Sequence, residues 1–377
     1  MILFLTILAG AVFIITALNV FVWPRPAAGS STISSDSEAN VSVLIPARNE
    51  ELNLGPCLDR LVGQPAIKEI LVYDDHSSDR TGEILAAYAL RHRFIRAVKV
   101  SDLKDGWCGK TYACSRLASE AKGDWLLFLD ADVRLAENAL GVMLEETCRR
   151  GLDFLSCWPR LLAESPGERL LMPMLNFAVF SIFPVPLMLL KDRRFTSQPS
   201  LGLAHGACMF FRKTEYAAFG GHERVKAELF EDTRIAQLWR SDERSGLCLD
   251  GWELLSIRMY SSIREIFFGF QKNFYPAFKS DLSFAGFLAF HFLTFLLPFI
   301  LIFVHPARAI IPAGIVLASR FLLKLRFGDT LLSVLLFPVA EIFLLLVAIS
   351  SWWRCWTGKG VGWKGRNYRQ LPKGVKQ

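Results

Sequence analysis

Two aspartates separated by one residue, Asp130 and Asp132, follow directly after the apolar run Trp125 to Leu129. A short run of this kind is typical of a strand that is buried on both faces of a parallel sheet. Since ligands of open α/β sheets bind outside the carboxyl ends of the strands, both carboxylates should face a ligand crevice. Such a pair suits Mg²⁺ or Mn²⁺, which take one or two carboxylates and complete their coordination with phosphate and water oxygens. The alternative is an acidic turn that merely ends the strand, and the other acidic motifs of the chain argue against it.

A second acidic pair, Asp74 and Asp75, ends the predicted strand Glu69 to Tyr73. Both side chains should point into the same crevice, where a carboxylate can accept hydrogen bonds from a uracil N3 or a ribose. A type I turn rich in Asp and Ser is the alternative. Two acidic strand ends in one sheet favour a nucleotide site over two unrelated turns.

Lys110 stands at the predicted start of the helix that precedes the Asp130 strand. A lysine at a helix N-terminus opposes the helix dipole, which suggests that it is there to bind a phosphate. The surrounding Gly-Trp-Cys-Gly-Lys is not a Walker A loop, because the GxxxxGK[ST] pattern is absent. Solvated surface is the alternative for this lysine.

Glu231 and Asp232 open a predicted amphipathic helix that runs from Thr233 to Trp239. One acid would be enough to cap that helix. Two acids beside a crevice suggest a general base, because a hydroxyl is a poor nucleophile until a nearby carboxylate accepts its proton. Two single histidines, His205 and His222, are more typical of hydrogen-bonded polar residues than of metal ligands.

Strands and helices alternate along the first 150 residues. The predicted strands are 41–46, 69–73, 94–100 and 125–129, and the helices between and after them are 51–62, one that ends near residue 90, 110–121 and 136–149. Alternation at this spacing indicates βαβ units and a parallel sheet. The predicted fold class is therefore α/β, with a Rossmann-like nucleotide-binding topology.

The composition indicates a membrane protein. Of the 377 residues, 52% are hydrophobic and the mean hydropathy is +0.31, so part of the chain should be solvated by lipid. Residues 1–23 carry no charged side chain and lack the basic start of a signal peptide, which predicts an uncleaved transmembrane anchor. Arg25 follows and places the next residues on the cytoplasmic side. Residues 24–40 are small and polar, as in a linker.

Cysteine spacing and charge exclude several classes of protein. The eight cysteines include no Cys-x-x-Cys, so neither a zinc site nor a disulfide framework is indicated. Free thiols fit a reducing compartment. The net charge of +7 is concentrated in the tail, residues 354–377, which suits anionic lipid head groups better than nucleic acid.

Three apolar runs lie between residues 283 and 353, at 284–304, 307–323 and 331–353. The basic tail at 354–377 should be cytoplasmic, yet three crossings that start inside would end outside. We therefore expect transmembrane and re-entrant helices, namely two spans plus one re-entrant or interfacial element. Glu341 in the last run should face other helices.

A charge-free run at 170–190 is long enough to span a bilayer. Its three prolines would leave backbone groups without partners in lipid. A crossing would also separate the following residues from Asp130 and Asp132. We expect this run to lie in the membrane interface or to dock on the sheet, within a catalytic domain that extends from residue 41 to 282 and includes interfacial helices.

Four strings resemble the motifs of family 2 glycosyltransferases with a GT-A fold, and the resemblance extends from about Val41 to Phe278. They are VSVLIPARNE, VYDDHSSD, FLDADV and LFEDTRIA. The runs GWCGKTYAC, GGH, RMY and GFQKN are similar to those of membrane-bound carotenoid and terpenoid-lipid glycosyltransferases. The tail sequence GWKGRNYR is similar to that of ceramide glucosyltransferases.

The resemblance implies an inverting transfer of a sugar from a nucleoside-diphosphate sugar, with UDP-glucose as the expected donor, to a membrane lipid such as a carotenoid or another terpenoid. It implies a GT-A domain with an N-terminal transmembrane anchor and C-terminal transmembrane helices, in a bacterial inner membrane. It also implies a divalent metal, Mg²⁺ or Mn²⁺, held by Asp132 and Asp130. Either Asp232 or Glu231 would be the base. The donor-binding residues would be Pro46, Arg48, Glu50, Asp74, Asp75, Lys110 and Asp130.

One departure from the family pattern bears on the product. Processive synthases carry Gln-x-x-Arg-Trp after the base, whereas this chain reads Gln271-Lys272-Asn273-Phe274-Tyr275. A single transfer is therefore expected. The alternatives are a polyprenyl-phosphate or ceramide-type sugar transferase and, from another class, a non-catalytic membrane protein that binds nucleotide sugars.

Overall fold

The computed structural model describes residues 1–27, 40–190, 196–278, 280–363 and 366–368. The predicted linker and basic tail lie partly outside these residues. The chain divides into two compact units. Unit 1 comprises Met1–Trp23, Ala163–Leu189 and Tyr260–Gln377, and unit 2 comprises Pro24–Leu162 and Leu190–Met259. Two parts of the predicted catalytic domain, 163–189 and 260–282, group with unit 1, and the boundary of that domain stays a prediction.

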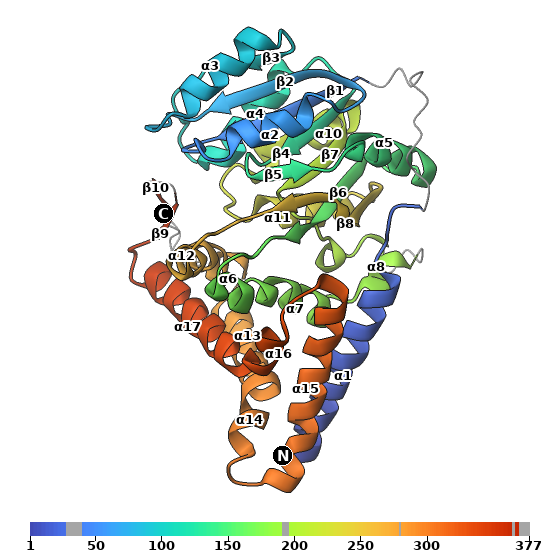
Figure 1. Cartoon of the computed structure of the whole chain (residues 1–377), viewed down its shortest axis with the longest axis vertical. Helices are drawn as coiled ribbons and strands as arrows, with labels where there is room; N and C mark the ends of the chain where they lie inside the picture. Colours follow the sequence, from blue (N-terminus) through green and yellow to red (C-terminus); the bar gives the residue numbers. More distant parts are fainter. Residues whose placement is uncertain (28–39, 191–195, 279, 364–365, 369–377) are drawn as a thin grey trace. The chain divides into compact units, whose positions relative to one another are not determined.

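Unit 2 is built on one mixed sheet, which in the described residues has eight strands in the order β3-β2-β1-β4-β7-β6-β8-β5 (Figure 1). The strands are β1 (Val41–Ala47), β2 (Ile67–Asp74), β3 (Ile95–Ala97), β4 (Trp125–Leu129), β5 (Val133–Leu135), β6 (Phe154–Leu161), β7 (Cys208–Arg212) and β8 (Gly246–Ile257). The α/β fold class is confirmed, and strands β1 to β4 pair in parallel as predicted. Strand β7 runs antiparallel to both of its neighbours, so the sheet as a whole is not parallel.

The strand register shows which strand ends lie side by side. We call the side of the sheet that these strand ends form the site edge; it is not an outer strand. Ala47 at the end of β1 pairs with Asp74 at the end of β2. Leu129 at the end of β4 pairs with Cys208 at the start of β7. The carboxyl ends of β1, β2 and β4 and the amino end of β7 therefore lie along the same edge.

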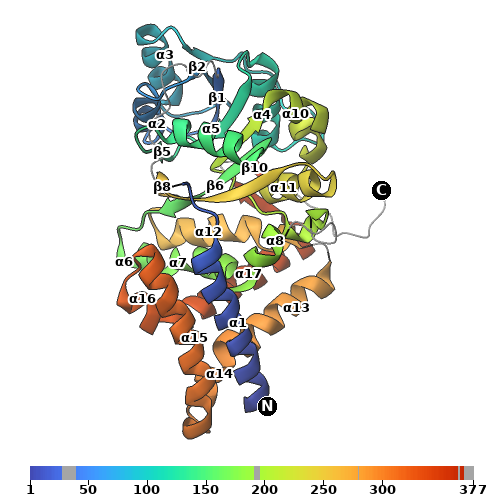
Figure 2. The ribbon, with the colours of Figure 1, turned by 90° about the vertical axis from the view of Figure 1, so that its right-hand side faces the viewer.

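Helices cover both faces of the sheet (Figure 2). Helices α2 (Leu54–Leu61), α3 (Thr81–Arg91) and α5 (Ala139–Arg150) contribute to one apolar core, and α4 (Gly109–Glu120), α10 (Lys213–Phe219) and α11 (Glu231–Ser241) contribute to the other. Because side chains alternate along a strand, Val43 of β1 enters the first core and Leu44 enters the second. The near-continuous apolar pattern of the central strands follows from burial on both faces.

Unit 1 is helical, with one small hairpin. Its helices are α1 (Ile2–Val22), α6 (Pro166–Leu171), α7 (Pro173–Ile182), α8 (Val185–Leu189), α12 (Ile263–Asn273), α13 (Asp281–His291), α14 (Leu297–Leu301), α15 (Pro306–Phe327), α16 (Leu331–Leu335) and α17 (Phe337–Trp356), and its strands are β9 (Val361–Trp363) and β10 (Arg366–Tyr368). A π-helical turn, Phe292–Leu296, joins α13 to α14.

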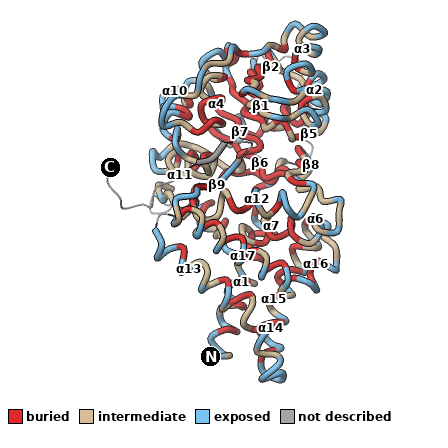
Figure 3. Tube along the Cα trace, turned by 90° about the vertical axis from the view of Figure 1, so that its left-hand side faces the viewer, coloured by how far each residue is buried: buried red, intermediate tan, exposed pale blue. Residues whose placement is uncertain are grey.

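Three helices of the described chain are long and apolar enough to cross a membrane: Ile2–Val22, Asp281–Leu301 and Phe337–Trp356. Figure 3 shows exposed residues recurring along α1 and α14, whereas the strands of the unit 2 sheet are mostly buried. Large apolar side chains are among the exposed ones, with Phe303 90% and Phe21 77% exposed. Such surfaces are stable in lipid but not in water.

The run at 170–190 is not one continuous helix. It is divided among α6, α7 and α8. Pro173 begins α7, Pro184 precedes α8 and Pro186 is the second residue of α8. Asn19 of α1 bonds to the backbone at the break between α7 and α8. Its Nδ2 donates to the carbonyl oxygens of Phe180 at 2.8 Å and Phe183 at 2.6 Å, and its Oδ1 accepts from the amide of Val185 at 3.1 Å. These bonds satisfy backbone groups that the broken helix exposes.

Glu341 of α17 faces another helix, as expected. His291 Nδ1, at the end of α13, lies 2.8 Å from Glu341 Oε1, and both side chains are fully buried. Two polar residues of different apolar helices thus bond to each other inside unit 1.

Candidate active site

Lys110 lies between two carboxylates of the site edge. Its Nζ is 2.8 Å from Asp130 Oδ1 and 3.0 Å from Glu231 Oε1. The first turn of α4 is fixed by the loop that leads to α11, because Cys108 N donates to the Lys226 carbonyl oxygen at 2.6 Å and Thr111 Oγ1 donates to the same oxygen at 2.7 Å. The structure therefore brings together Lys110, Asp130 and Glu231, three residues predicted from separate motifs.

The two neighbouring carboxylates stabilise the charged form of Lys110. Burial lowers the pKa of Lys110, but the negative charges of Asp130 and Glu231 outweigh that effect and raise this pKa well above its ordinary value. Lys110 is therefore a permanent cation at neutral pH.

Asp232 is held by two backbone amides. Its Oδ2 accepts from the amide of Gly206 at 2.6 Å, and its Oδ1 accepts from the amide of Thr233 at 2.6 Å. A Cβ atom at position 206 would lie 2.9 Å from Asp232 Oδ2, so glycine permits this close approach. Burial and the neighbouring charge of Glu231 raise the pKa of Asp232 to about 7, although Lys110 and the two amides act in the opposite direction. A carboxylate with this pKa exchanges a proton near neutral pH.

Asp130 and Asp132 occupy the turn between β4 and β5, and both are partly buried. No group of three His, Cys, Asp or Glu that could hold a metal occurs among the described residues. The chemistry of the two carboxylates nevertheless fits Mg²⁺ or Mn²⁺, which bind proteins through as few as one or two carboxylates when phosphate oxygens and water supply the other ligands.

The second acidic pair has two different roles. Asp75 is 8% exposed, and its carbonyl oxygen accepts from Arg48 Nη1 at 2.5 Å while its carboxylate lies 4.0 Å from the same nitrogen. Asp74 Oδ1 accepts from the amide of Ser77 at 3.2 Å. Asp74 thus stabilises the turn after β2, which is the alternative considered from the sequence, and Asp75 stands beside a cation at the site edge.

Pro46 and Glu50 flank the loop that follows β1. Pro46 pairs with Tyr73 of β2. Glu50 donates its amide to Thr81 Oγ1 at 2.7 Å, and its carboxylate accepts from Asn53 Nδ2 at 2.9 Å. These contacts fix the loop that carries Arg48.

His222 is buried, as expected of a hydrogen-bonded polar residue. Its Nδ1 lies 2.7 Å from the hydroxyl of Tyr216, and burial lowers its pKa to about 3. Gly221 has φ +55°, and a Cβ atom there would lie 2.7 Å from the Tyr216 ring. The double glycine therefore allows the turn to pack on Tyr216.

The sequence motifs did not identify the segment that enters β7 as part of the site. Gly206 binds Asp232, and His205 before it bonds to Ser156 of β6 through its amide at 2.8 Å and its carbonyl oxygen at 3.1 Å. The available signal was weak, because a His-Gly pair before an apolar run has no motif of its own.

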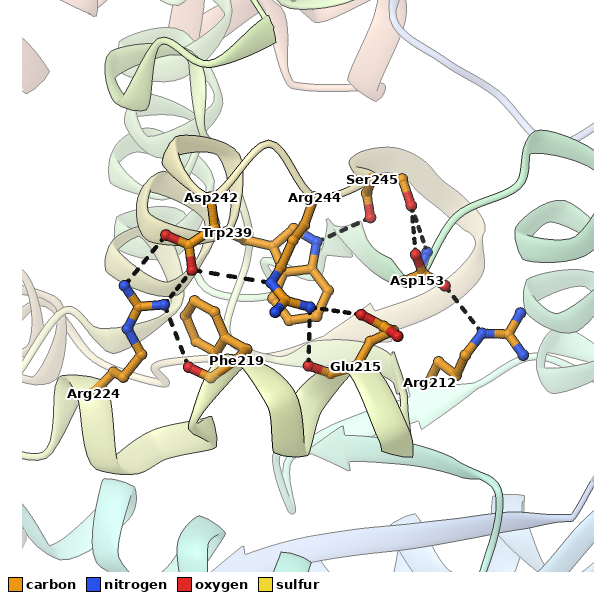
Figure 4. A network of polar contacts seen from close by, with 9 residues as sticks. All are labelled: Asp153, Arg212, Glu215, Phe219, Arg224, Trp239, Asp242, Arg244 and Ser245. Atoms are coloured by element: carbon orange, nitrogen blue, oxygen red, sulfur yellow. Dashed lines mark hydrogen bonds and ion pairs between the residues drawn. The ribbon is translucent and has the colours of Figure 1, made fainter.

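Another charged cluster of unit 2, which we call the α10–α11 network, is drawn in Figure 4. Because Arg212 pairs with Trp125 at the start of β4, the end of β7 lies at the edge of the sheet opposite the site edge. Arg212 ends β7, and its Nε lies 3.0 Å from Asp153 Oδ1 just before β6. Arg244 Nη1 lies 2.6 Å from Glu215 Oε2, and Arg224 pairs with Asp242. Each acid in this network has a cationic partner.

Comparisons with known proteins match part of this chain to a glycosyltransferase family. Residues 42–217 match the model of the family described as "Glycosyl transferase family 2". The 4,4'-diaponeurosporenoate glycosyltransferase of Staphylococcus haemolyticus is 31% identical over 234 residues, which cover 60% of this chain and 58% of the relative. The protein of the same name from Staphylococcus aureus (strain USA300) is 28% identical over 228 residues, which cover 58% and 56%. The chain thus spans less than two thirds of the length of these relatives.

The fold is similar to that of a solved enzyme, the mannosyltransferase PcManGT from Pyrobaculum calidifontis in complex with GDP-Man and Mn²⁺. The TM-score is 0.54 at 17% sequence identity, and the alignment covers 94% of this chain and 99% of that chain. This similarity supports the GT-A assignment of the fold.

Proposed function

We propose that this chain, whose residues 42–217 match the glycosyl transferase family 2 model, transfers one sugar from a nucleoside-diphosphate sugar to a lipid of the membrane that anchors it. UDP-glucose is the first donor to test, and a carotenoid or another terpenoid is the first acceptor. The transfer inverts the anomeric centre and is not processive. The apolar helices of unit 1 anchor the chain, with the family 2 domain on the cytoplasmic side.

One observation carries this proposal. Asp130 and Glu231 meet at Lys110, while Asp232, the next residue, is held by two amides and has a pKa of about 7. An acid that we propose to bind the metal ion, a permanently charged lysine and a carboxylate that can exchange a proton thus lie at one edge of the sheet. Those are the groups that a transfer from a diphosphate to a hydroxyl requires.

On the donor side, Asp75 with Arg48 beside it is placed to accept hydrogen bonds from the nucleoside. Asp130 and Asp132 would hold the divalent cation. When bound, that cation supplies charge neutralisation to the departing diphosphate. Lys110 contributes a further positive charge beside Asp130.

On the acceptor side, Asp232 is the better candidate for the base. Its raised pKa makes it a stronger proton acceptor than an ordinary aspartate, and its two amide bonds fix its orientation. The acceptor oxygen bonds to the anomeric carbon from the face opposite the diphosphate, the bond to the diphosphate breaks, and the hydroxyl proton passes to Asp232. Glu231 remains paired with Lys110 and raises the pKa of Asp232.

The pH dependence separates two classes of acceptor. For an alcohol, Asp232 must be ionised, so the rate should rise as the pH passes through about 7. A carboxylate acceptor, the kind that the name diaponeurosporenoate describes, has no proton to lose. For such an acceptor the protonated form of Asp232 is favourable because it avoids repulsion, and the rate should fall over the same range.

The direct test uses the full chain in vesicles of phosphatidylglycerol and phosphatidylethanolamine, with radiolabelled UDP-glucose and Mn²⁺. The vesicles contain 4,4'-diaponeurosporenoate, a long-chain isoprenoid alcohol or an isoprenoid phosphate. Label in the lipid extract, with a gain of one hexose mass, supports the proposal. Label transferred solely to the isoprenoid phosphate supports a polyprenyl-phosphate sugar synthase instead. Mn²⁺-dependent UDP binding without UDP release from UDP-glucose supports the non-catalytic alternative and contradicts the proposal.

A further inference from the structure

The segment that enters β7 holds His205 rigidly beside the proposed base. Ser156 of β6 binds both backbone groups of His205, and the adjacent amide of Gly206 binds Asp232. The ring of His205 packs edge-on against Trp158 with a centroid distance of 5.1 Å. Strands β6 and β7 and the start of α11 thus fix both the backbone and the ring.

The hydrogen bonds of this ring define its tautomer. The amide of Ala207 donates to His205 Nδ1 at 3.2 Å, so Nδ1 carries no proton and the neutral ring carries its proton on Nε2. Burial lowers the pKa of His205 to about 4. His205 is therefore a neutral donor over the whole physiological pH range.

The two histidines of the site differ in what their second nitrogen can reach. His222 is 1% exposed, and its Nε2 is enclosed within unit 2. His205 is partly exposed, and within the described part of the chain its Nε2 has no hydrogen-bond partner. The charges of Asp130 and Lys110 act on the His205 ring, so the ring lies near the charged residues of the site edge. A fixed N–H group in that position is suited to bind a ligand oxygen.

The position of His205 in the sheet favours the acceptor over the nucleoside. In the strand order β2-β1-β4-β7-β6, Asp75, which we propose contacts the nucleoside, follows β2 directly, whereas His205 precedes β7, three strands away. Its nearest functional neighbour by sequence is Gly206, which holds the base. An oxygen that reaches Asp232 therefore comes to the side of the site where His205 lies.

We infer that His205 is a specificity residue whose Nε2–H donates a hydrogen bond to the oxygen-bearing end of the acceptor beside Asp232. This inference rests on the proposed glycosyltransferase function and extends it to acceptor choice. The site edge gathers Asp130, Glu231 and Asp232, so an acceptor oxygen there needs a donor. A neutral imidazole supplies one without competing with Asp232 for the proton.

The test compares two substitutions of similar length, His205→Gln and His205→Met, in the full chain. The glutamine amide nitrogen can take the place of Nε2, and methionine keeps a similar volume without a donor. Sugar transfer is measured with UDP-glucose and either 4,4'-diaponeurosporenoate or an isoprenoid alcohol in vesicles. Hydrolysis of UDP-glucose without a lipid acceptor is measured in parallel. His92→Met, at the surface end of α3, is the matched control.

We expect His205→Met to lower kcat/KM for the acceptor about tenfold or more, with the KM for UDP-glucose and the hydrolysis rate unchanged. His205→Gln should retain activity to within about threefold, and His92→Met should match the wild type. Equal kinetics in the two His205 variants, or a rise in the KM for UDP-glucose, would overturn the inference. If the wild type transfers no sugar to any lipid, the proposed function fails instead.

Discussion

Two of the charged clusters in the described part of unit 2, the site edge and the α10–α11 network, lie at opposite edges of one sheet and differ in how their charges are balanced. In the α10–α11 network, three carboxylates face three guanidinium groups, as in the Arg244–Glu215 pair at 2.6 Å (Figure 4). At the site edge, Asp130, Glu231 and Asp232 gather around one lysine. Charge balance is what a structural network requires, and an excess of carboxylates costs stability unless a ligand compensates it.

The excess of carboxylates at the site edge also changes the pKa of one of its acids. Asp232 has its pKa raised to about 7 by burial and by Glu231, a shift that stabilises its protonated form. Perturbed acids of this kind concentrate at functional sites, although structural ion pairs can perturb acids too. The comparison therefore predicts that substitutions at the site edge reduce turnover and that substitutions in the network reduce stability.

The largest effect is expected for Asp132→Asn, which removes a carboxylate from the pair that we propose binds the cation. Sugar transfer should fall at least about 10³-fold, since metal stabilisation of a leaving diphosphate contributes several kcal/mol. The melting temperature should not fall, because the substitution removes a charge from an acidic cluster. Calorimetry of Mn²⁺-dependent UDP binding, with Asp242→Asn of the network as control, measures the cause directly. Full transfer activity in the Asp132 variant would contradict the prediction that substitutions at the site edge reduce turnover.

Asp232→Asn is expected to have the next largest effect. With an alcohol acceptor, loss of the base should lower kcat by about 10²- to 10⁴-fold. The KM for UDP-glucose should stay close to that of the wild type. The rate of transfer under saturating donor checks this expectation, and Asp153→Asn in the network serves as the matched acid. A loss below tenfold with the alcohol would assign the proton transfer to another group.

Glu231→Gln should shift the pH dependence without abolishing it. The charge of Glu231 raises the pKa of Asp232, so its removal lowers that pKa, and the ionised base then persists to lower pH. The midpoint of the normalised rate profile for an alcohol acceptor should move down by about one pH unit from about 7. An unchanged midpoint, or one that moves upward, would contradict this account of the pair.

The smallest effect on activity is expected for Arg244→Met in the α10–α11 network. The variant loses the ion pair to Glu215 and the contact of the guanidinium with Trp239, whose ring centre lies 5.4 Å away. Because both partners are partly solvated, the cost is about 1 kcal/mol, or about 2 to 4 °C in melting temperature. The kcat/KM should stay within about twofold. A tenfold loss of activity would mean that the two edges of the sheet are coupled.

The sequence indicated where acidic residues would gather, because an acid directly after a buried strand lies at the carboxyl end of that strand. Asp130, Glu231 and Lys110 were predicted from separate motifs and lie together. The reversed direction of β7 could not be predicted, since the apolar run Cys208–Arg212 has the same pattern in either direction.

The different roles of Asp74 and Asp75 and the position of His205 depend on tertiary contacts that a sequence motif does not show. Asp74 and Asp75 are neighbours of one type, yet the first caps a turn and the second lies beside Arg48. The position of His205 is fixed by Ser156, which lies 49 residues earlier in the sequence, and by the hydrogen bond from the Gly206 amide to Asp232. Such assignments follow from tertiary packing rather than from local sequence.

The bond between His291 and Glu341 has a consequence for how the chain is made. Each residue stands in a different helix that is apolar enough to enter the bilayer, and each is fully buried in the finished unit. A lone glutamate in lipid would oppose insertion by about 2.5 to 3.5 kcal/mol. Pairing with His291 of the earlier helix lowers that cost. We therefore expect the later helix to insert more readily when the earlier one is nearby, so insertion should be sensitive to the 35 residues between Leu301 and Phe337.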